Sequence, residues 1–188
     1  MKMGRLIAAV VVLAALAGTL YWSNHRKPKE DTTAAASAST KIISLKQEDI
    51  EKLQIKQRDG DEVVLARVSP EEWKITSPKS LIADQQTVSS ILSDLSPLQA
   101  DQVIEEKAGD LKAYGLAEPA VEVSATVKDG KPQKLLIGDD TPAGGTAYAM
   151  LEGDPRVFTI ASSSKTTFEK GLKDLRDKRL MPVDFEKA

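Results

Sequence analysis

The sequence contains no cysteine, and its only histidine is His25. Without cysteine the chain forms no disulfide, builds no thiolate metal site and offers no attachment point for a lipoprotein anchor. His25 lies near the N-terminus, outside the part of the chain that we expect to fold. Ser-His-Asp and Cys-His catalytic groups and histidine-rich metal sites are therefore excluded from that part, and its stability must come from buried apolar side chains.

Aromatic residues make up only 4% of the chain, and the formal net charge is −2, with 26 basic and 28 acidic residues. Charges of both signs are scattered along the sequence, which argues against a dedicated nucleic-acid-binding surface. Among the aromatic residues, we expect Trp73 and Tyr114 to be core or half-buried side chains and not a platform for stacking a ligand.

One long apolar stretch is present, from Leu6 to Trp22, and Lys2 and Arg5 precede it. A short basic tip before an apolar segment is typical of bacterial export and membrane-targeting segments. The stretch has seventeen residues and would span about 25 Å as a helix, slightly less than a hydrocarbon core of about 30 Å. We predict a membrane anchor and its basic flank over residues 1–29.

The main alternative is a cleaved signal peptide, because Ala15-Leu16-Ala17 is a possible cleavage site, although it lies inside the apolar run. Orientation is the second open point, since Arg26, Lys27 and Lys29 follow the segment and nearly balance the charges before it. The short N-terminal tip favours export of the C-terminal part. We expect a single-pass protein of the bacterial cytoplasmic (inner) membrane, with its domain on the periplasmic side.

Residues 30–40 read EDTTAAASAST and contain no bulky apolar side chain. So little apolar surface cannot offset the entropy lost on ordering, and we predict a flexible linker. The residues after it are enough for one domain with its own core. We assign residues 41–181 to an extracytoplasmic α+β domain and residues 182–188 to a tail.

The domain begins with short apolar runs separated by turn signals. The steps Asp59-Gly60 and Asp129-Gly130 each join two such runs, which predicts two β-hairpins in which glycine supplies the positive φ of a tight turn. The expected strands are residues 41–45, 50–55, 63–68, 73–75, 102–105, 121–125, 135–137, 147–151 and 157–160.

Apolar residues at helical spacing predict a helix after Asp84, its N-cap, and a second helix after Ser162 or Ser163. A short helix is expected at residues 111–114, ending at Gly115. The apolar faces consist of Val88, Ile91, Leu92 and Leu95 in the first helix and of Phe168, Leu172 and Leu175 in the second.

The order hairpin, strand and helix occurs twice, and residues 73–75 and 158–160 have matching roles in it. We therefore predict an α+β fold of two degenerate hairpin–strand–helix units, with an antiparallel sheet and helices packed on it, behind an N-terminal transmembrane helix. A chance likeness between two strand-turn-strand segments is the alternative.

Carboxylates are the remaining candidates for chemistry. Asp139 and Asp140, before a glycine-rich loop, and Asp154 offer oxygen ligands for Ca²⁺, but the alternating spacing of an EF-hand loop is absent. The alternative is a hairpin loop in which Asp, Pro and Gly serve turn geometry. No pair of acidic residues stands out as an acid–base pair, so we predict no catalytic residue, no cofactor-binding residue and no metal ligand.

Two further segments are candidate binding sites. Gly138 and Gly144-Gly145 lack the spacing and the Lys-Ser/Thr ending of a phosphate-binding loop. Residues 176–179, Arg-Asp-Lys-Arg, form a basic cluster that would contact anionic lipid or an acidic partner. Alternatively, these cations serve the C-terminus of the preceding helix, whose backbone dipole favours positive charge.

Five short segments, taken in order, resemble the domain of unknown function family 4340, found in bacterial envelope proteins with one N-terminal membrane segment. The resemblance runs from Lys41 onward, and many relatives continue past its last segment, which implies a short or truncated member. Some relatives are encoded beside gliding-motility-type ABC transporter components, and the resemblance implies no catalytic residue. The segments are Trp73-Lys74-Ile75-Thr76-Ser77-Pro78, Ala83-Asp84, Tyr114-Gly115-Leu116 with Pro119, Leu136-Ile137-Gly138 and Leu175-Arg176-Asp177-Lys178.

We expect a non-catalytic protein that acts by binding, as an accessory or scaffold subunit of a bacterial envelope complex, an ABC-transporter-associated complex being one form. Its partners would be the membrane, through the N-terminal helix, and an envelope or transporter protein, with no nucleic acid, cofactor or small-molecule substrate. The alternative is a carboxylate-based envelope enzyme, or a protein that binds a small ligand or glycan. That alternative predicts a concave site lined by acidic residues with raised pKa values.

Overall fold

The structure is a computed structural model that describes residues 40–128 and 130–179. The apolar stretch Leu6–Trp22, His25, residues 30–39 of the predicted linker and the tail lie outside these residues, whereas Thr40, the last residue of the predicted linker, pairs in β1. The strands are β1 (Thr40–Lys41), β2 (Ile50–Gln57), β3 (Val63–Ser69), β4 (Glu72–Ser77), β5 (Leu81–Ile82), β6 (Gln99–Ala100), β7 (Gln102–Glu105), β8 (Val121–Val127), β9 (Gln133–Asp140), β10 (Thr146–Leu151) and β11 (Val157–Ala161). The helices are η1 (Gln47–Asp49), α2 (Gln85–Leu95), η2 (Leu111–Tyr114), α3 (Ser162–Phe168) and α4 (Leu172–Leu175).

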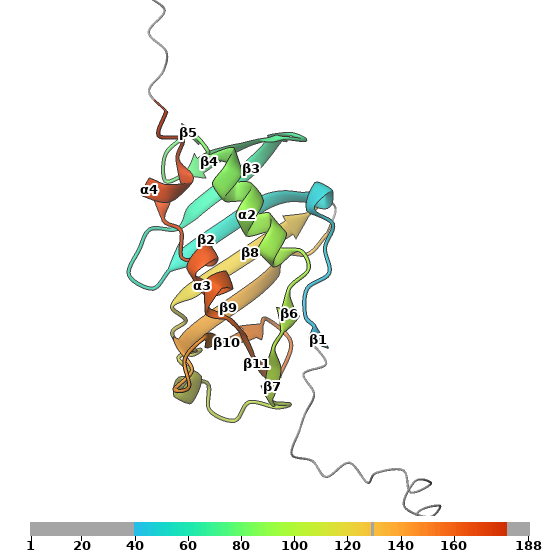
Figure 1. The fold of residues 1–188 in the computed structure, drawn as a ribbon. Coiled ribbons are helices and arrows are strands. Elements are labelled where there is room, and N and C mark those ends of the chain that lie inside the picture. The colour runs from blue at the N-terminus through green and yellow to red at the C-terminus, as the bar shows by residue number, and fades with distance from the viewer. Residues whose placement is uncertain (1–39, 129, 180–188) are drawn as a thin grey trace, which may run out of the picture. The chain divides into compact units, whose positions relative to one another are not determined.

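Nine of the strands form one antiparallel sheet in the order β5-β4-β3-β2-β8-β9-β10-β11-β7, and β1 pairs separately with β6. Strands β2 and β8 lie side by side at the middle of the sheet, and two meanders, β2–β5 and β8–β11, run outward from them (Figure 1). Each meander is followed in the chain by a helix, α2 or α3. The predicted α+β class is confirmed in a form dominated by antiparallel sheet.

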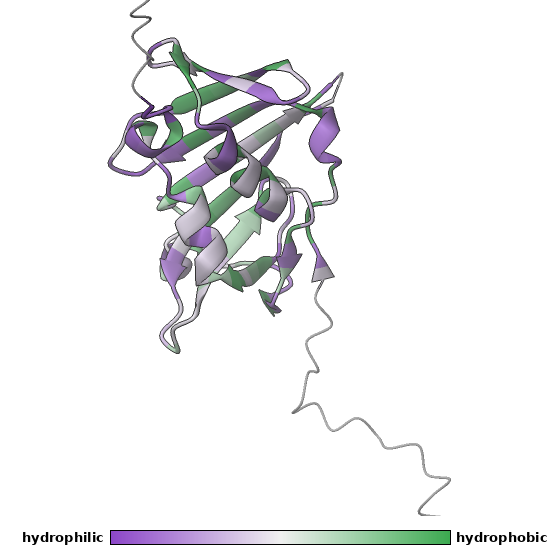
Figure 2. Cartoon of the chain, turned by 45° about the horizontal axis from the view of Figure 1, so that its top comes forward, coloured by the Kyte–Doolittle hydropathy of each residue, from purple (hydrophilic) through white to green (hydrophobic). Residues whose placement is uncertain are grey.

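The core lies between one face of the sheet and the two helices, α2 and α3, which cover that face (Figure 1). Figure 2 shows that hydrophobic residues are concentrated on the strands, while the turns and helices carry more hydrophilic residues. Along the central strand β2, Leu53 and Ile55 are buried. The predicted apolar face of α2 is confirmed, because its four residues Val88, Ile91, Leu92 and Leu95 are all buried in this core.

Helix α2 begins where its sequence places it. The Asp84 carboxylate accepts a hydrogen bond from the Thr87 amide at 2.8 Å, which satisfies one of the free N–H groups of the first turn. The helix ends at Leu95, and the amide of its C-cap, Ser96, still donates to the Leu92 carbonyl. An N-cap and a four-residue apolar face together were enough to define this element.

The predicted second helix is wrong in extent. Helix α3 ends at Phe168, and α4 begins only after Gly171, whose backbone is extended (φ −88°, ψ 178°). The N-cap of α3 is Ala161 without a side-chain hydrogen bond, not Ser162 or Ser163. Phe168 and Leu175 are nevertheless both buried. Two short helices therefore pack on the same core, and their apolar residues have the sequence spacing expected of a single helix.

Both predicted hairpins form, β2–β3 and β8–β9, although residue 129 of the second turn lies outside the described residues. The reason given for the first turn was wrong. Gly60 is not one of the glycines with positive φ, which are Gly115, Gly144, Gly145 and Gly153. The loop of residues 58–62 is closed instead by the Gly60 amide, which donates to the Gln57 carbonyl at 3.3 Å.

Two other strand predictions need correction. Of the expected strand at 41–45, only Lys41 pairs regularly, in β1, because the amides of Ile42 and Ile43 both donate to the Leu98 carbonyl, at 2.9 and 3.1 Å. The segments 73–75 and 158–160 do not occupy equivalent places either. Counted outward from the central pair, β4 is the third strand of its meander and β11 is the fourth.

The connector between the meanders contributes Leu98 and Ala100 to the core and β7 to the edge of the sheet, and its η2 part packs on the opposite face. Its strand β7 and its short helix η2 have the predicted bounds, and η2 ends at Gly115 with φ 66°. Tyr148 lies between the core residues Ala147 and Ala149, so it points to the opposite face. There its ring meets the ring of Tyr114 edge to face, with centroids 4.9 Å apart.

This core assignment generates the first prediction. Ile91→Ala should lower the free energy of unfolding by about 2–5 kcal/mol, because it removes a fully buried side chain of α2 from the core. Ser90→Ala, one position along on the exposed side, should change it by less than about 0.5 kcal/mol. Urea denaturation of the purified protein measures both, and equal effects would contradict the assigned face.

Candidate interaction surface

The sheet face opposite to α2 and α3 is uncovered near the middle of the sheet. No described helix lies over strands β2 to β5 and β8 on this side, and the side chains there are exposed or half-buried. We call this surface the open face. Its residues are Lys52, Gln54, Lys56, Val64, Ala66, Lys74, Thr76, Ile82, Glu122, Ser124, Thr126 and Lys134.

Four cross-strand neighbours form a row on the open face from β2 to the β5 edge. Lys52 pairs with Ala66, Ala66 with Lys74, and Lys74 with Ile82. Residues directly opposite each other in a ladder share one face, so the four side chains lie next to one another. In the described part of the chain, neither Lys52 nor Lys74 forms an ion pair. We call these four residues the lysine row.

A second set of charges on the open face is neutralised internally. Glu122 lies between two lysines, 3.4 Å from the Lys56 ammonium and 3.7 Å from that of Lys134. Lys134 also meets Glu152 at 3.1 Å, and this contact raises the pKa of Lys134. These residues come from three adjacent strands and the turn after β10. Their ion pairs link neighbouring strands, and the opposite charges largely cancel at the surface.

Between the two charged sets lies a shallow groove of about 490 Å³. Its polar lining includes Gln54, Ser124 and Thr126, which offer amide and hydroxyl groups from the two central strands. Glu62 closes one side by accepting a 2.7 Å hydrogen bond from the Gln54 amide. A surface of this kind can bind a protein segment or a sugar through hydrogen bonds, but it presents no nucleophile with an adjacent base.

The sequence did not reveal the open face as a surface. Alternation in β2 is readable, because Lys52, Gln54 and Lys56 alternate with the buried residues Leu53 and Ile55. What the sequence lacks is the register between strands, which decides whether these lysines face small residues, acids or each other. The alternation within β2 was therefore the one sequence signal that pointed to an exposed sheet face.

The three aspartates considered as calcium ligands are each engaged by a different cation. Lys165 lies 3.1 Å from Asp140, and Arg156 lies 2.6 Å from Asp154. Asp139 lies 3.7 Å from Arg58. Within the described residues no three His, Asp or Glu side chains are grouped so that they could hold a metal ion. Turn geometry and ion pairing account for these carboxylates.

Two carboxyl groups have displaced pKa values, and both are displaced downward. The hydrogen-bonded guanidinium of Arg156 lowers the pKa of Asp154, and that of Arg179 lowers the pKa of Asp177. A general acid at neutral pH needs the opposite displacement. Neither residue therefore has the property that the carboxylate-enzyme alternative requires.

Gly138, one of the glycines that do not form a phosphate-binding loop, has a structural role. A Cβ atom at this position would lie 2.0 Å from the Tyr114 carbonyl oxygen, so the backbones of β9 and the η2 end approach closely. On the η2 side of this contact, a Cβ on Gly115 would lie 2.4 Å from the Asp139 side chain. Two of the segments that carry the family resemblance thus meet in space, and glycine is required by that contact.

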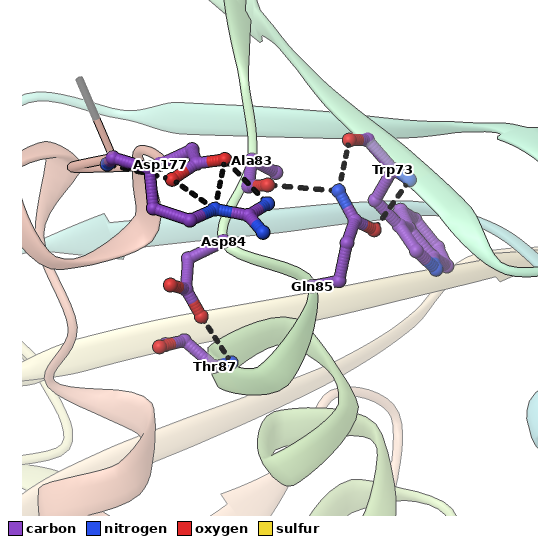
Figure 3. Close-up of polar contacts among 7 residues, drawn as sticks. Trp73, Ala83, Asp84, Gln85, Thr87 and Asp177 are labelled. Atoms are coloured by element: carbon purple, nitrogen blue, oxygen red, sulfur yellow. Dashed lines mark hydrogen bonds and ion pairs between the residues drawn. The ribbon is translucent and has the colours of Figure 1, made fainter. Parts of the chain in front are cut away.

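Three other such segments meet at the β5 edge (Figure 3). The Gln85 side chain accepts from the Trp73 amide at 2.8 Å and donates to the carbonyls of Trp73 and Ala83, at 3.0 and 2.8 Å. The Gln85 side chain therefore pairs with the Trp73 backbone as a neighbouring strand would. The buried Trp73 ring also lies under the Arg67 guanidinium, whose central carbon is 4.9 Å from the ring centroid. Trp73 and Tyr114 are thus core and half-buried residues, as expected.

The basic cluster 176–179 is part of the same junction. The Leu175 carbonyl accepts from the Asp84 amide at 2.7 Å, and the Asp177 amide donates to the Ile82 carbonyl at 2.9 Å. The segment therefore extends the sheet beyond β5, and the Asp177 carboxylate binds the Arg179 guanidinium at 2.7 Å (Figure 3). Backbone pairing explains the position of the cluster, and its contact with lipid or an acidic partner stays a prediction.

The sequence profile of the family described as Domain of unknown function (DUF4340) matches residues 73–188, more than half of the chain. The chain belongs to the DUF4340 family. The match begins at Trp73, later than the resemblance noted from Lys41, so β2 and β3 precede it. All five motif segments of this DUF4340 member fall inside the match and lie at contacts between elements. No curated protein and no solved structure matches the chain.

No helix within residues 40–128 and 130–179 is long and apolar enough to cross a membrane. The anchor prediction rests on Leu6–Trp22, which lies outside those residues, and it stays a prediction.

The close approach at Gly138 generates a second prediction. Gly138→Ala should destabilise the protein by about 1–3 kcal/mol or more, since the new methyl group would collide with the backbone at Tyr114. Gly109→Ala is the matched control, because nothing lies within 4 Å of its Cβ position, and it should cost less than about 0.5 kcal/mol. Equal melting temperatures for the two variants would show that the η2 end does not rest on β9.

The pair of Asp154 and Arg156 generates a third prediction. Because the folded-state pKa of Asp154 is lowered, its contribution to stability is complete above the unfolded pKa of about 3.9 and is lost as pH falls through the folded-state value. Arg156→Met should lower the melting temperature at neutral pH and flatten its decline between about pH 5 and pH 2. Parallel curves of melting temperature against pH for the variant and the parent protein would contradict this assignment.

Proposed function

We propose that this protein is a non-catalytic binding module, anchored in the bacterial inner membrane, that serves as an accessory or scaffold subunit of an envelope complex. The observation that carries the proposal is the open face. It extends over six adjacent strands of the sheet, from β5 to β9, and presents lysines, small residues and an exposed isoleucine instead of a covering helix. Surfaces held on a rigid sheet suit recognition of a partner, because little is lost in ordering them.

The chemistry of the described residues supports binding over catalysis. The aspartates that were candidates for acid–base or calcium chemistry are neutralised one by one by lysine or arginine. The pKa of Asp154 is lowered, whereas a carboxylate-based enzyme needs an acid with a raised value. One pocket is lined by the acids Asp59, Glu118 and Glu122, but Lys56 and Arg58 line the same pocket, so its charges are mixed.

The location of the protein rests on the sequence. The apolar stretch with a basic tip supports the membrane anchor, and the short linker supports a domain held close to the bilayer. Membership of the DUF4340 family adds the resemblance to envelope proteins with one N-terminal membrane segment. An ABC-transporter-associated complex is the form of partner that this resemblance implies.

The second candidate function is binding of a small ligand or glycan in the open-face groove. Its volume of about 490 Å³ and its lining of Gln54, Ser124 and Thr126 favour this candidate. Hydroxyl and amide groups in a shallow groove suit a sugar. The groove lies beside the lysine row, so a single face would serve either function.

In-cell crosslinking of the full-length protein, followed by membrane purification and mass spectrometry, tests the proposal. We expect one reproducible set of membrane or envelope proteins in the adducts. The set should be lost in Leu92→Asp, because a charge in the core under α2 unfolds the domain, and kept in Ser93→Asp, because Ser93 is exposed. The same set recovered with Leu92→Asp, or no adduct from correctly inserted protein, would overturn the proposal.

Tethering is tested separately. A soluble exported form of residues 41–188 should recover the same proteins with at least a tenfold lower yield, since loss of the anchor lowers the effective concentration at the membrane from about the millimolar range. Equal yield from the soluble and anchored forms would show that the anchor has no part in the function.

A further inference from the structure

We propose that the lysine row, Lys52, Ala66, Lys74 and Ile82, docks an acidic segment of the partner protein. This inference rests on the proposed binding function and adds to it the chemical class of the partner. It depends on three observations: two cations without a partner, an apolar end to the row, and the position of the row on the sheet.

The first observation concerns charge. Lys52 and Lys74 flank Ala66 and form no ion pair with described residues, whereas Lys56 and Lys134 on the same face are both paired. The acidic residues nearest along the strands, Glu51 and Glu72, are exposed and form no ion pair with the row. Two neighbouring unpaired cations set up a positive potential that carboxylates of a partner would satisfy.

The second observation concerns apolar surface. Ile82 ends the row with 51% of its surface exposed, and Val68 is 56% exposed. Val68 lies on β3 close to the row, at an irregularity of the β3–β4 ladder between Arg67 and Ser69. An exposed apolar side chain directly opposite an unpaired lysine, as Ile82 is opposite Lys74, is typical of a protein-binding site that combines apolar and charged contacts.

The spacing within the row specifies the partner segment further. Lys52 and Lys74 are two strands apart, which places their backbones about 10 Å from each other. Two turns of an α-helix advance about 10 Å, so carboxylates at positions i and i+7 of a helix lying along the row would reach both lysines. An apolar residue one turn further would meet Ile82.

The third observation separates a protein partner from a lipid surface. The chain enters the domain at β1, which pairs with β6, and β6 lies next to β11, where the Asp101 amide donates to the Thr159 carbonyl at 2.8 Å. Strand β5 forms the opposite edge of the nine-stranded sheet (Figure 1). Measured across the strands from β11, the lysine row therefore lies about 19 Å away at Lys52 and about 34 Å away at Ile82, on the half of the sheet away from the chain entry. A partner protein reaches it there more readily than the bilayer does.

The test places a photocrosslinking residue in the row. In the full-length protein in its own membrane, p-benzoylphenylalanine replaces Ile82 or, as control, Ser90 on the exposed side of α2. We expect a protein adduct from position 82 whose crosslinked peptide contains two or more acidic residues. The adduct should fall roughly tenfold or more in the Lys52→Glu/Lys74→Glu double variant, because two attractions become two repulsions.

A charge swap makes the result specific. Reversing the acidic residues of the crosslinked partner peptide to lysine should restore the adduct with the Lys52→Glu/Lys74→Glu variant. Lys46→Glu/Lys112→Glu is the matched control with the same change in net charge, and it should leave the adduct unchanged, since both residues are exposed and lie off the row.

Four outcomes would overturn the inference. These are a lipid adduct from position 82, an adduct unaffected by charge reversal, a crosslinked peptide without acidic residues, and a protein adduct only from position 90. The last three leave the proposed binding function intact, because a partner is still captured. No adduct from either position, together with an empty result in the general crosslinking experiment, would remove the proposed function itself.

Discussion

The pairing of β2 with β8 is the contact on which the rest of the structure depends. It joins strands that lie far apart in the sequence, in a register that runs from Ile50 opposite Val127 to Gln57 opposite Val121. Both meanders are added outward from this pair, and both helices then cover the same side. The register also decides which residues become core and which form the open face, because a shift by one residue would exchange the two sets.

Local sequence signals were enough to predict the elements that are specified by their own residues. Asp84 and four apolar residues specified α2, and the run Leu111–Tyr114 before Gly115 specified η2. Elements that exist only through distant partners escaped prediction. Strand β5 has two residues and forms because β4 and the segment after α4 flank it, and α3 and α4 are separate because Gly171 is extended. The lysine row belongs to this second class, since it is assembled from four strands by register alone.

The motif segments of the family lie where elements touch. Gly138 allows the approach of Tyr114, Gln85 bonds the backbone of Trp73, and Asp84 receives the segment after α4. A sequence profile built on such positions identifies the architecture and carries no information about a ligand. Lys52 and Ala66 of the lysine row precede Trp73, where the match begins, and Lys74 and Ile82 follow it, so the profile covers only half of this surface.

The irregular start of the domain determines how it would respond to mechanical load. A pull on the chain before Thr40 acts first on the short β1–β6 pairing, then on the two amides that share the Leu98 carbonyl, and then on buried Ile43. These contacts lie outside the nine-stranded sheet, so the long ladders are not in the line of force. The first few described residues would therefore detach before any strand of the nine-stranded sheet does.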